Sequence, residues 1–194
     1  PLMARLRKVI PRGPRILRPL KIRTTFFKLF RITIFLSWEV RLTRLPKKIW
    51  NKLVPADENN LCTWAMRCML AVGNGKVVLI DCGMGDKQDA KFFGHYEPHG
   101  DFSIEASLKQ LGMVPGDVTD VFLTHLHFDH CGGAVKRTDK GKLIPAYENA
   151  RYWSNERQWN WANNPNAREK ASFLTENFVP LQQHGVLHFI EEHE

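Results

Sequence analysis

The chain has 194 residues, of which 43% are hydrophobic, and its formal net charge is +8. This length is sufficient for one domain with a sizeable core, or for most of a larger domain, and it excludes the very small folds that depend on disulfides. The four cysteines form no C-x-x-C pair, so we expect reduced thiols and a cytoplasmic location.

The positive charge is concentrated at the start of the chain. Residues 1–50 contain 14 Lys and Arg and the single acid Glu39, which leaves 14 of the 28 basic and 19 of the 20 acidic residues for the rest. We therefore interpret residues 1–45 as a basic, poorly defined leader and residues 46–194 as the folded domain. An arm that binds nucleic acid or an anionic membrane is an alternative, because clustered Lys and Arg attract phosphate groups.

An apolar run over residues 26–38 lies within this leader. Lys28 and Arg31 interrupt the run, and a membrane-spanning helix needs about 20 apolar residues. No small-residue cleavage pattern follows the run, so the sequence does not favour a signal peptide either. We expect no membrane span.

Two strands and a hairpin are predicted next. The apolar runs 61–71 and 76–81 are separated by Gly73-Asn74-Gly75, and an Asn-Gly turn between two such runs is a strong hairpin signal. Val77–Ile80 is continuously apolar, as in a strand that is buried on both faces. Asp81 follows it into a glycine-rich loop, where its carboxylate either caps local amides or orients a site.

A helix and a further strand precede the most distinctive stretch. Ser103 can cap a helix that ends at Gly112 and carries its apolar residues on one face: Ile104, Leu108 and Leu111. A turn at residues 115–117 then leads into an apolar strand over residues 120–124. Alternating strands and helices predict an α/β fold, in which sites collect at strand ends and in the loops that follow.

The C-terminal part is predicted to continue this alternation. A strand is expected over residues 150–153, followed by a helix that begins at Ser154. A second helix is expected over residues 168–178, ended by Pro180, and a last strand over residues 186–190.

The stretch from Thr124 to Gly133 carries the candidate chemistry. It contains three imidazoles and one carboxylate within six residues: His125, His127, Asp129 and His130. Residues two apart on a strand share a side, so the first two histidines can converge on one cation, while the other two residues can serve a second position. These donors suit Zn²⁺ best, with Fe or Mn as alternatives. Thr124 and Asp120 are candidates for hydrogen bonds to the ligands.

The motif His125-x-His127-x-Asp129-His130, followed by Gly132-Gly133, resembles the signature of the metallo-β-lactamase-fold hydrolases. It is most similar to the lactonase and organophosphate-hydrolase branch. The run Val77–Gly83 matches the strand of that family that ends in Asp-x-Gly. The resemblance covers residues 46–194 and implies an αββα sandwich, of which this sequence holds the N-terminal half and the start of the second half. It therefore implies a C-terminally truncated domain.

The resemblance also implies roles for individual residues. His125 and His127 would bind one zinc, Asp129 and His130 the second, and Asp81 would hold the motif loop by hydrogen bonds. A metal-bridging hydroxide would attack an ester, lactone or related bond of a small-molecule substrate. Asp129 would move the proton from the nucleophile to the leaving group.

Part of the family's ligand set has no match in this sequence. The family adds two histidines and a bridging aspartate after the motif, whereas here only His184, His188 and His193 follow, with no aspartate after Asp139. We interpret the three histidines as structural or surface residues. Two alternatives therefore remain open: a catalytically silent fragment, and a nucleic-acid-processing member of the same fold, which only the basic leader supports.

The aromatic-rich segment 92–99 includes His95 and His99. It is interpreted as a packed surface loop, with a wall of the substrate pocket as the alternative.

Overall fold

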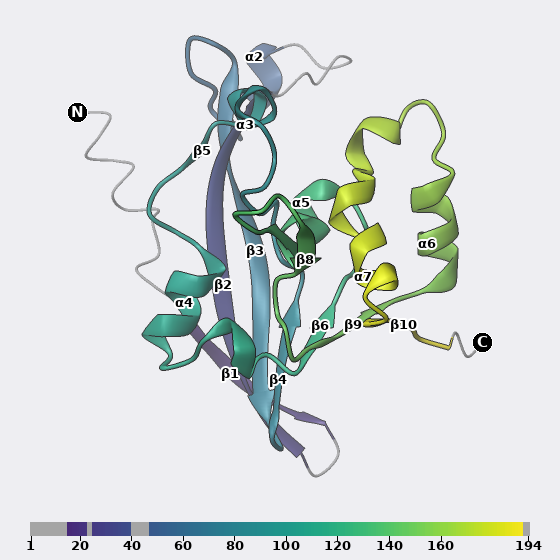
Figure 1. Ribbon diagram of the computed structural model, residues 1–194. Helices are drawn as coiled ribbons and strands as arrows, with labels where there is room; N and C mark the ends of the chain where they lie inside the picture. Colours follow the sequence, from purple (N-terminus) through teal and green to yellow (C-terminus); the bar gives the residue numbers. More distant parts are fainter. Residues whose placement is uncertain (1–14, 23–24, 40–46, 192–194) are drawn as a thin grey trace.

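The computed structural model describes residues 15–22, 25–39 and 47–191 (Figure 1). Within them the chain forms one large sheet in the order β1-β2-β3-β4-β6-β9-β10, with β5 paired to β2, and a separate hairpin of β7 and β8. The strands of the large sheet are β1 (Arg15–Ile22), β2 (Thr25–Glu39), β3 (Leu61–Gly73), β4 (Lys76–Ile80), β5 (Pro98–His99), β6 (Asp120–Phe122), β9 (Arg151–Ser154) and β10 (Leu187–Phe189). The hairpin consists of β7 (Val135–Arg137) and β8 (Leu143–Pro145).

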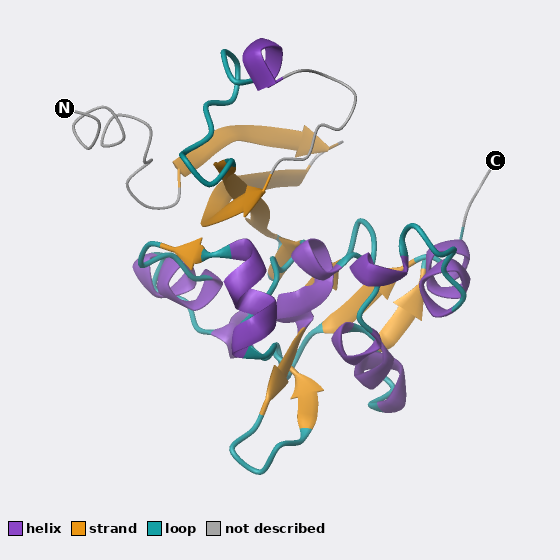
Figure 2. Cartoon of the chain, turned by 90° about the horizontal axis from the view of Figure 1, so that it is seen from above, coloured by secondary structure: helices purple, strands orange, loops and turns teal. Residues whose placement is uncertain are grey.

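The helices are short and most of them lie on one side of the long strands (Figure 2). They are α2 (Lys47–Trp50), α3 (Ala90–Tyr96), α4 (Ile104–Gln110), α5 (Phe128–Cys131), α6 (Glu156–Asn163) and α7 (Val179–Gln183). Four 3-10 turns accompany them: η1 (Pro115–Asp117), η2 (Gly132–Ala134), η3 (Lys170–Ser172) and η4 (Thr175–Asn177). None of the helices in the described part of the chain is long and apolar enough to span a membrane.

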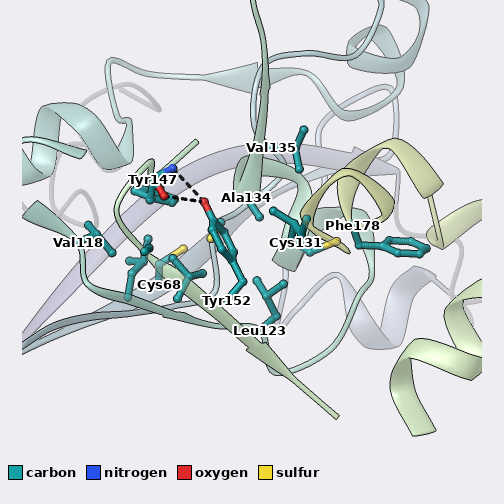
Figure 3. Close-up of a cluster of buried hydrophobic side chains, with 14 of the residues drawn as sticks. Cys68, Val118, Leu123, Cys131, Ala134, Val135, Tyr147, Tyr152 and Phe178 are labelled. Carbon is teal, nitrogen blue, oxygen red and sulfur yellow. Dashed lines mark hydrogen bonds between the residues drawn. The ribbon is translucent and has the colours of Figure 1, made fainter. Parts of the chain in front are cut away.

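The core lies between the sheet and the helices. Leu70, Leu79, Val121 and Tyr152 are partners in register across β3, β4, β6 and β9, and all four are fully buried. Residues of α4, α5, α6 and α7 belong to the same cluster. Figure 3 shows Tyr152 in this cluster, where its hydroxyl donates to the carbonyl of Tyr147 and accepts from the amide of that residue. The four cysteines are free and buried.

The next row of residues faces the other side of the sheet, because side chains alternate along a strand. Met69, Ile80, Phe122 and Trp153 are partners in register across the same four strands, and each is only half-buried. This row of apolar side chains on the side of the sheet away from the helices is therefore incompletely covered.

Several predicted elements are confirmed. Asn74 and Gly75 have φ angles of 50° and 67° and join β3 to β4, as a tight hairpin turn with two left-handed residues requires. Ser103 caps α4 by accepting a hydrogen bond from the amide of Ala106 at 2.9 Å. The strands predicted near residues 61–71, 76–81, 120–124, 150–153 and 186–190 are β3, β4, β6, β9 and β10.

The helix predicted over residues 168–178 is wrong. The separate turns η3 and η4 occupy this stretch. Pro180 lies in the first turn of α7, where a proline fits because its missing amide hydrogen would have no partner there. The helix predicted from Ser154 begins two residues later, at Glu156, with Asn155 as its cap.

The structure also differs from the prediction of a poorly defined leader over residues 1–45. Strands β1 and β2 fall within it, and β2 pairs with β3 along its length, from Lys28 opposite Val72 to Glu39 opposite Leu61. Strand β2 depends on hydrogen bonds to a partner strand tens of residues away, and a scan for local signals does not detect such pairing. The remainder of the predicted leader lies outside the described residues.

Candidate metal centre

Strand β6 and the parallel strand β4 end at the same edge of the sheet, and the motif begins there. Residues 123–127 form a loop, and α5 starts at Phe128 with Asp129 and His130 in its single turn. The motif histidines therefore lie on a loop and a helical turn rather than on the predicted strand. Their rings are nevertheless close, because the loop turns sharply into α5.

The three imidazole rings form one group. The ring centroids of His125 and His127 are 4.7 Å apart, and those of His125 and His130 are 3.8 Å apart. Burial lowers the pKa of His125, and the charges of His130 and His127 lower it further. A neutral imidazole is the form that binds metal ions, so this environment favours ligand chemistry.

Asp81 joins both ends of the motif by hydrogen bonds. Its Oδ1 accepts from the amide of Thr124 at 2.9 Å, and the Thr124 hydroxyl lies 3.0 Å from Oδ1 and 2.9 Å from Oδ2. Its Oδ2 lies 2.8 Å from Nδ1 of His130. Burial opposes ionisation, but the hydrogen bonds from His130 and Thr124 keep the pKa of the Asp81 carboxyl below its usual value. Asp81 is therefore an ionised acceptor in the geometry that the resemblance implies.

The contact with Asp81 sets the orientation of the His130 ring. Because Nδ1 faces a carboxylate, it carries the proton, and Nε2 is the nitrogen with a free lone pair. Nε2 lies 3.5 Å from Oδ2 of Asp129. Burial lowers the pKa of His130, but its hydrogen bond to Asp81 and the charges of Asp129 and Asp81 outweigh this effect and raise that pKa.

The residue types in the motif fit a zinc site, since imidazole nitrogens and carboxylate oxygens are its usual ligands. Their present side-chain positions do not yet form one: among the described residues, no group of three or more His, Cys, Asp or Glu side chains is placed to hold a metal ion. The donors are neighbours, and side-chain rotations would be needed to direct their lone pairs at common points.

The two glycines that end the motif are in contact with the loop after β4. A Cβ atom on Gly132 would lie 2.1 Å from the carbonyl oxygen of Met84, and one on Gly133 would lie 2.2 Å from that of Cys82. The amide of Gly133 donates to the carbonyl of Gly83 at 2.9 Å, and the amide of Cys82 donates to that of His130 at 2.7 Å. The glycines are thus required by a close backbone contact between two loops.

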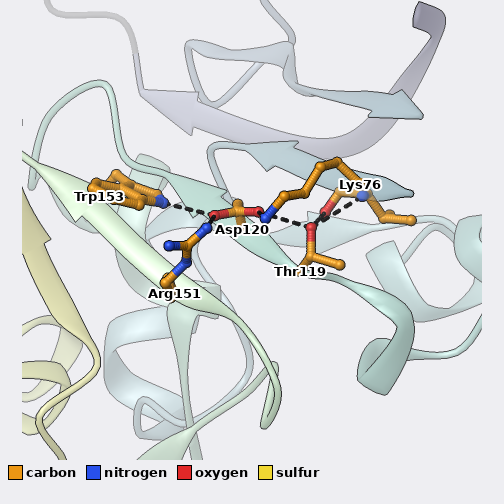
Figure 4. Close-up of polar contacts among 6 residues, drawn as sticks. Lys76, Thr119, Asp120, Arg151 and Trp153 are labelled. Carbon is orange, nitrogen blue, oxygen red and sulfur yellow. Dashed lines mark hydrogen bonds and ion pairs between the residues drawn. The ribbon is translucent and has the colours of Figure 1, made fainter. Parts of the chain in front are cut away.

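Thr124 and Asp120, both proposed as partners of the ligands, have different positions. The Thr124 hydroxyl lies 3.2 Å from Nδ1 of His125. Asp120 is at the opposite end of β6, where its carboxylate accepts hydrogen bonds from four side chains (Figure 4): Lys76 at 3.0 Å, Thr119 at 2.8 Å, Arg151 at 3.1 Å and Trp153 at 3.0 Å. The prediction for Asp120 is therefore wrong.

The histidines after the motif make other contacts. Nε2 of His184 lies 3.3 Å from the carbonyl oxygen of Leu143, and the His188 ring packs 5.1 Å from that of Trp153. His193 lies outside the described residues. In the segment 92–99, the exposed His99 has its Nδ1 2.9 Å from the carbonyl oxygen of Glu97.

A pocket of about 180 Å³ adjoins the motif. Asp129 and His130 form one side of it together with Asp81, and the other lining residues are Trp64, Ala65, Met66, Arg67, Cys68, Tyr96 and Phe128. The rings of Tyr96 and Phe128 pack 4.8 Å apart. Burial raises the pKa of Tyr96, and the charge of Asp129 raises it further. The contribution of β3 was not predicted, because only the sheet brings this strand to the motif. Tyr96 belongs to the segment 92–99, for which a wall of the substrate pocket was the alternative interpretation.

Residues 67–193 match the family model of the Metallo-beta-lactamase superfamily. The chain belongs to this superfamily. The predicted family is therefore confirmed, as is the predicted α/β fold class. No curated protein matches the chain at a significant level.

Solved structures share the metallo-beta-lactamase fold of this chain. A probable metal-dependent hydrolase from Staphylococcus aureus has a TM-score of 0.72 and 23% identity, over 86% of this chain and 60% of its own. The dizinc quorum-quenching lactonase AidC has a TM-score of 0.64 and 18% identity, and the match covers 94% of this chain and 62% of AidC. The hydrolase AbOPH has a TM-score of 0.63 and 18% identity, and the match covers 93% of this chain and 62% of AbOPH. The chain thus spans about three fifths of the length of these structures.

Proposed function

We propose that the chain provides one side of the active site of a zinc-dependent hydrolase that cleaves an ester, lactone or related bond in a small molecule. His125, His127, Asp129 and His130 would supply the metal ligands. The observation that carries the proposal is the position of Asp81, whose carboxylate accepts hydrogen bonds from both Thr124 and His130 and so gathers the motif at one edge of the sheet.

Bound zinc would lower the pKa of a coordinated water toward neutrality and polarise the oxygen of the bond to be cleaved. The chain's own residues would prepare this chemistry. Asp81 leaves Nε2 of His130 free to bind. Asp129, which lies beside that nitrogen and lines the pocket, would take a proton from the attacking water and pass it to the leaving group. Tyr96 and Phe128 would hold an apolar part of the substrate and exclude water.

The comparisons support this proposal through the family and the fold. AidC is a dizinc lactonase, and AbOPH is a hydrolase of the beta-lactamase superfamily. Zinc is preferred over iron or manganese for this chain because of its imidazole-rich donor set. The proposed substrate class, an ester, lactone or related bond, is based on the similarity to this lactonase and this hydrolase.

The first test is zinc content after dialysis, measured for the unchanged chain and for a His125→Ala, His127→Ala double variant. We expect about two equivalents in the unchanged chain, as in a two-metal site, and a loss of at least one in the variant. His188→Ala is the matched control, because this exposed histidine packs on Trp153 away from the motif and its removal should leave the zinc content unchanged. An unchanged chain that retains no zinc would contradict the proposal.

The second test is hydrolysis of an aryl ester and of an acyl lactone by the zinc-loaded chain. Turnover that is lost in Asp129→Asn supports the hydrolase. The alternative is a catalytically silent chain. Zinc binding without turnover of either substrate would support that alternative.

A further inference from the structure

Lys87 is a buried cation that the proposed chemistry does not use. It lies in the loop between β4 and α3, and only 7% of its surface is exposed. Lysine is almost never buried to this degree without a partner, because removal of an ammonium group from water is costly. Its position therefore needs a specific contact.

That contact is with the residue that follows α5. The ammonium group of Lys87 donates a hydrogen bond to the carbonyl oxygen of Gly132. Carbonyls at the end of a helix have no partner within the helix, and Gly132 is itself buried. Among the described residues, this oxygen is the only hydrogen-bond acceptor of Lys87.

The charge state of Lys87 is consistent with its hydrogen bond to the Gly132 carbonyl. Burial lowers the pKa of Lys87 to about 8, and the nearby groups Cys131, Glu176 and Asp86 act in the opposite direction. The side chain therefore remains mostly protonated at neutral pH, and its ammonium group can donate to the carbonyl.

The surrounding backbone links this contact to the candidate ligands. Helix α5 is a single turn that carries Asp129 and His130. The carboxylate of Asp81 holds the ring of His130 from one side, and the carbonyl of His130 accepts from the amide of Cys82. Lys87 is the side chain that holds the far end of the same turn.

We infer that Lys87 is a positioning residue for the candidate metal site: through the Gly132 carbonyl, it fixes the helical turn that presents Asp129 and His130. The inference rests on the proposed function for its effect on metal binding. Its structural part, the restraint of residues 128–133, does not depend on any metal.

The structural part is tested by hydrogen exchange in the metal-free protein. Lys87→Met removes the donor and keeps an unbranched side chain that is one atom shorter, and Lys87→Arg keeps a donor. We expect the amides of His130, Cys131 and Gly133 to exchange at least about tenfold faster in Lys87→Met. The amides of Leu123 and Tyr152, which are bonded in the sheet, should be unaffected. Lys87→Arg should restore most of the protection.

The functional part is tested by zinc affinity, measured in competition with a chromophoric chelator. Residues that orient metal ligands typically contribute about 10–100-fold in affinity, and we expect a loss in this range for Lys87→Met and a smaller one for Lys87→Arg. Lys91→Met, at an exposed position of α3, is the control and should match the unchanged chain.

Three results for Lys87→Met would overturn the inference. The first is unchanged exchange of the three amides, and the second is unchanged zinc affinity. The third is a chain that cannot fold, which would make Lys87 a general structural residue. If the unchanged chain binds no zinc but Lys87→Met still accelerates exchange at residues 130–133, the proposed function fails and the restraint by Lys87 stands. The two readouts thus separate the two ideas.

Discussion

At the scale of single residues, Asp81 has the most unusual conformation at the candidate site. Its φ of 59° lies in the left-handed region, which is unfavourable for a residue with a Cβ atom by about 1–2 kcal/mol. The hydrogen bonds to Thr124 and His130 offset this strain, because each joins a charged acceptor to a donor in the motif. The strained residue is thus Asp81 itself, whose carboxylate accepts the hydrogen bonds from the motif.

Asp81→Asn tests this arrangement with little change in size, and asparagine tolerates the left-handed conformation. The variant loses one acceptor oxygen and the charge, so we expect the free energy of unfolding to fall by about 1–3 kcal/mol. Zinc affinity should fall by about 10–100-fold, because the ring of His130 is no longer held by a carboxylate. Denaturant unfolding and chelator competition measure the two effects. Asp86→Asn, at an exposed position of the same loop, is the control, and equal behaviour of the two variants would contradict the role of Asp81.

At the scale of elements, the contact between the loop after β4 and the turn after α5 sets the shape of the site. The two segments touch through their backbones, with glycines on one side and the carbonyls of Cys82 and Met84 on the other. Backbone atoms cannot move aside as a flexible side chain can. The spacing of the two loops therefore permits no side chain at the end of the motif.

Gly132→Ala is expected to destabilise the protein by more than about 2 kcal/mol, because the added methyl group would overlap the carbonyl of Met84. Gly94→Ala provides the matched comparison. Gly94 lies in α3 with nothing within 4 Å of an added Cβ, so the same change should be neutral or stabilising by up to about 1 kcal/mol. Thermal or denaturant unfolding of both variants measures the difference. Equal stability of the two variants would show that the loops can separate without penalty.

At the scale of the whole molecule, Asp120 links three strands at the end of the sheet away from the motif. Its carboxylate joins Lys76 of β4 to Arg151 and Trp153 of β9 (Figure 4). Burial opposes its ionisation, but hydrogen bonds from Trp153, Thr119 and Lys76, with the charge of Lys76, hold the pKa of Asp120 below its usual value. The parallel part of the sheet is therefore stabilised by an ionised carboxylate.

The lowered pKa of Asp120 predicts acid sensitivity. A carboxyl group whose pKa is lower in the folded state stabilises the fold above its unfolded-state pKa of about 3.9, and this contribution disappears as the pH falls through the folded-state value. Asp120→Asn should reduce the free energy of unfolding by about 1 kcal/mol at pH 7 and should remove part of the loss of stability below about pH 4. Urea unfolding at several pH values measures this. The exposed Asp139→Asn is the control, and parallel pH profiles for Asp120→Asn and the unchanged chain would refute the prediction.

Features that depend on neighbouring residues could be predicted from the sequence. The Asn74-Gly75 turn, the Ser103 cap and the density of metal donors between His125 and His130 each follow from residue types at short spacing. The family also follows from such a pattern, since its signature is contained in a few adjacent residues.

Other features depended on partners that are distant in the sequence. Strand β2 forms by pairing with β3, the carbonyl that Lys87 binds is 45 residues away, and the partner of Asp120 on β4 is 44 residues away. Hydrogen bonds and ion pairs act over a few ångströms in space, whatever the separation along the chain. The sequence by itself therefore determined which chemistry the motif can support, and only the tertiary structure decided which residues hold that motif in place.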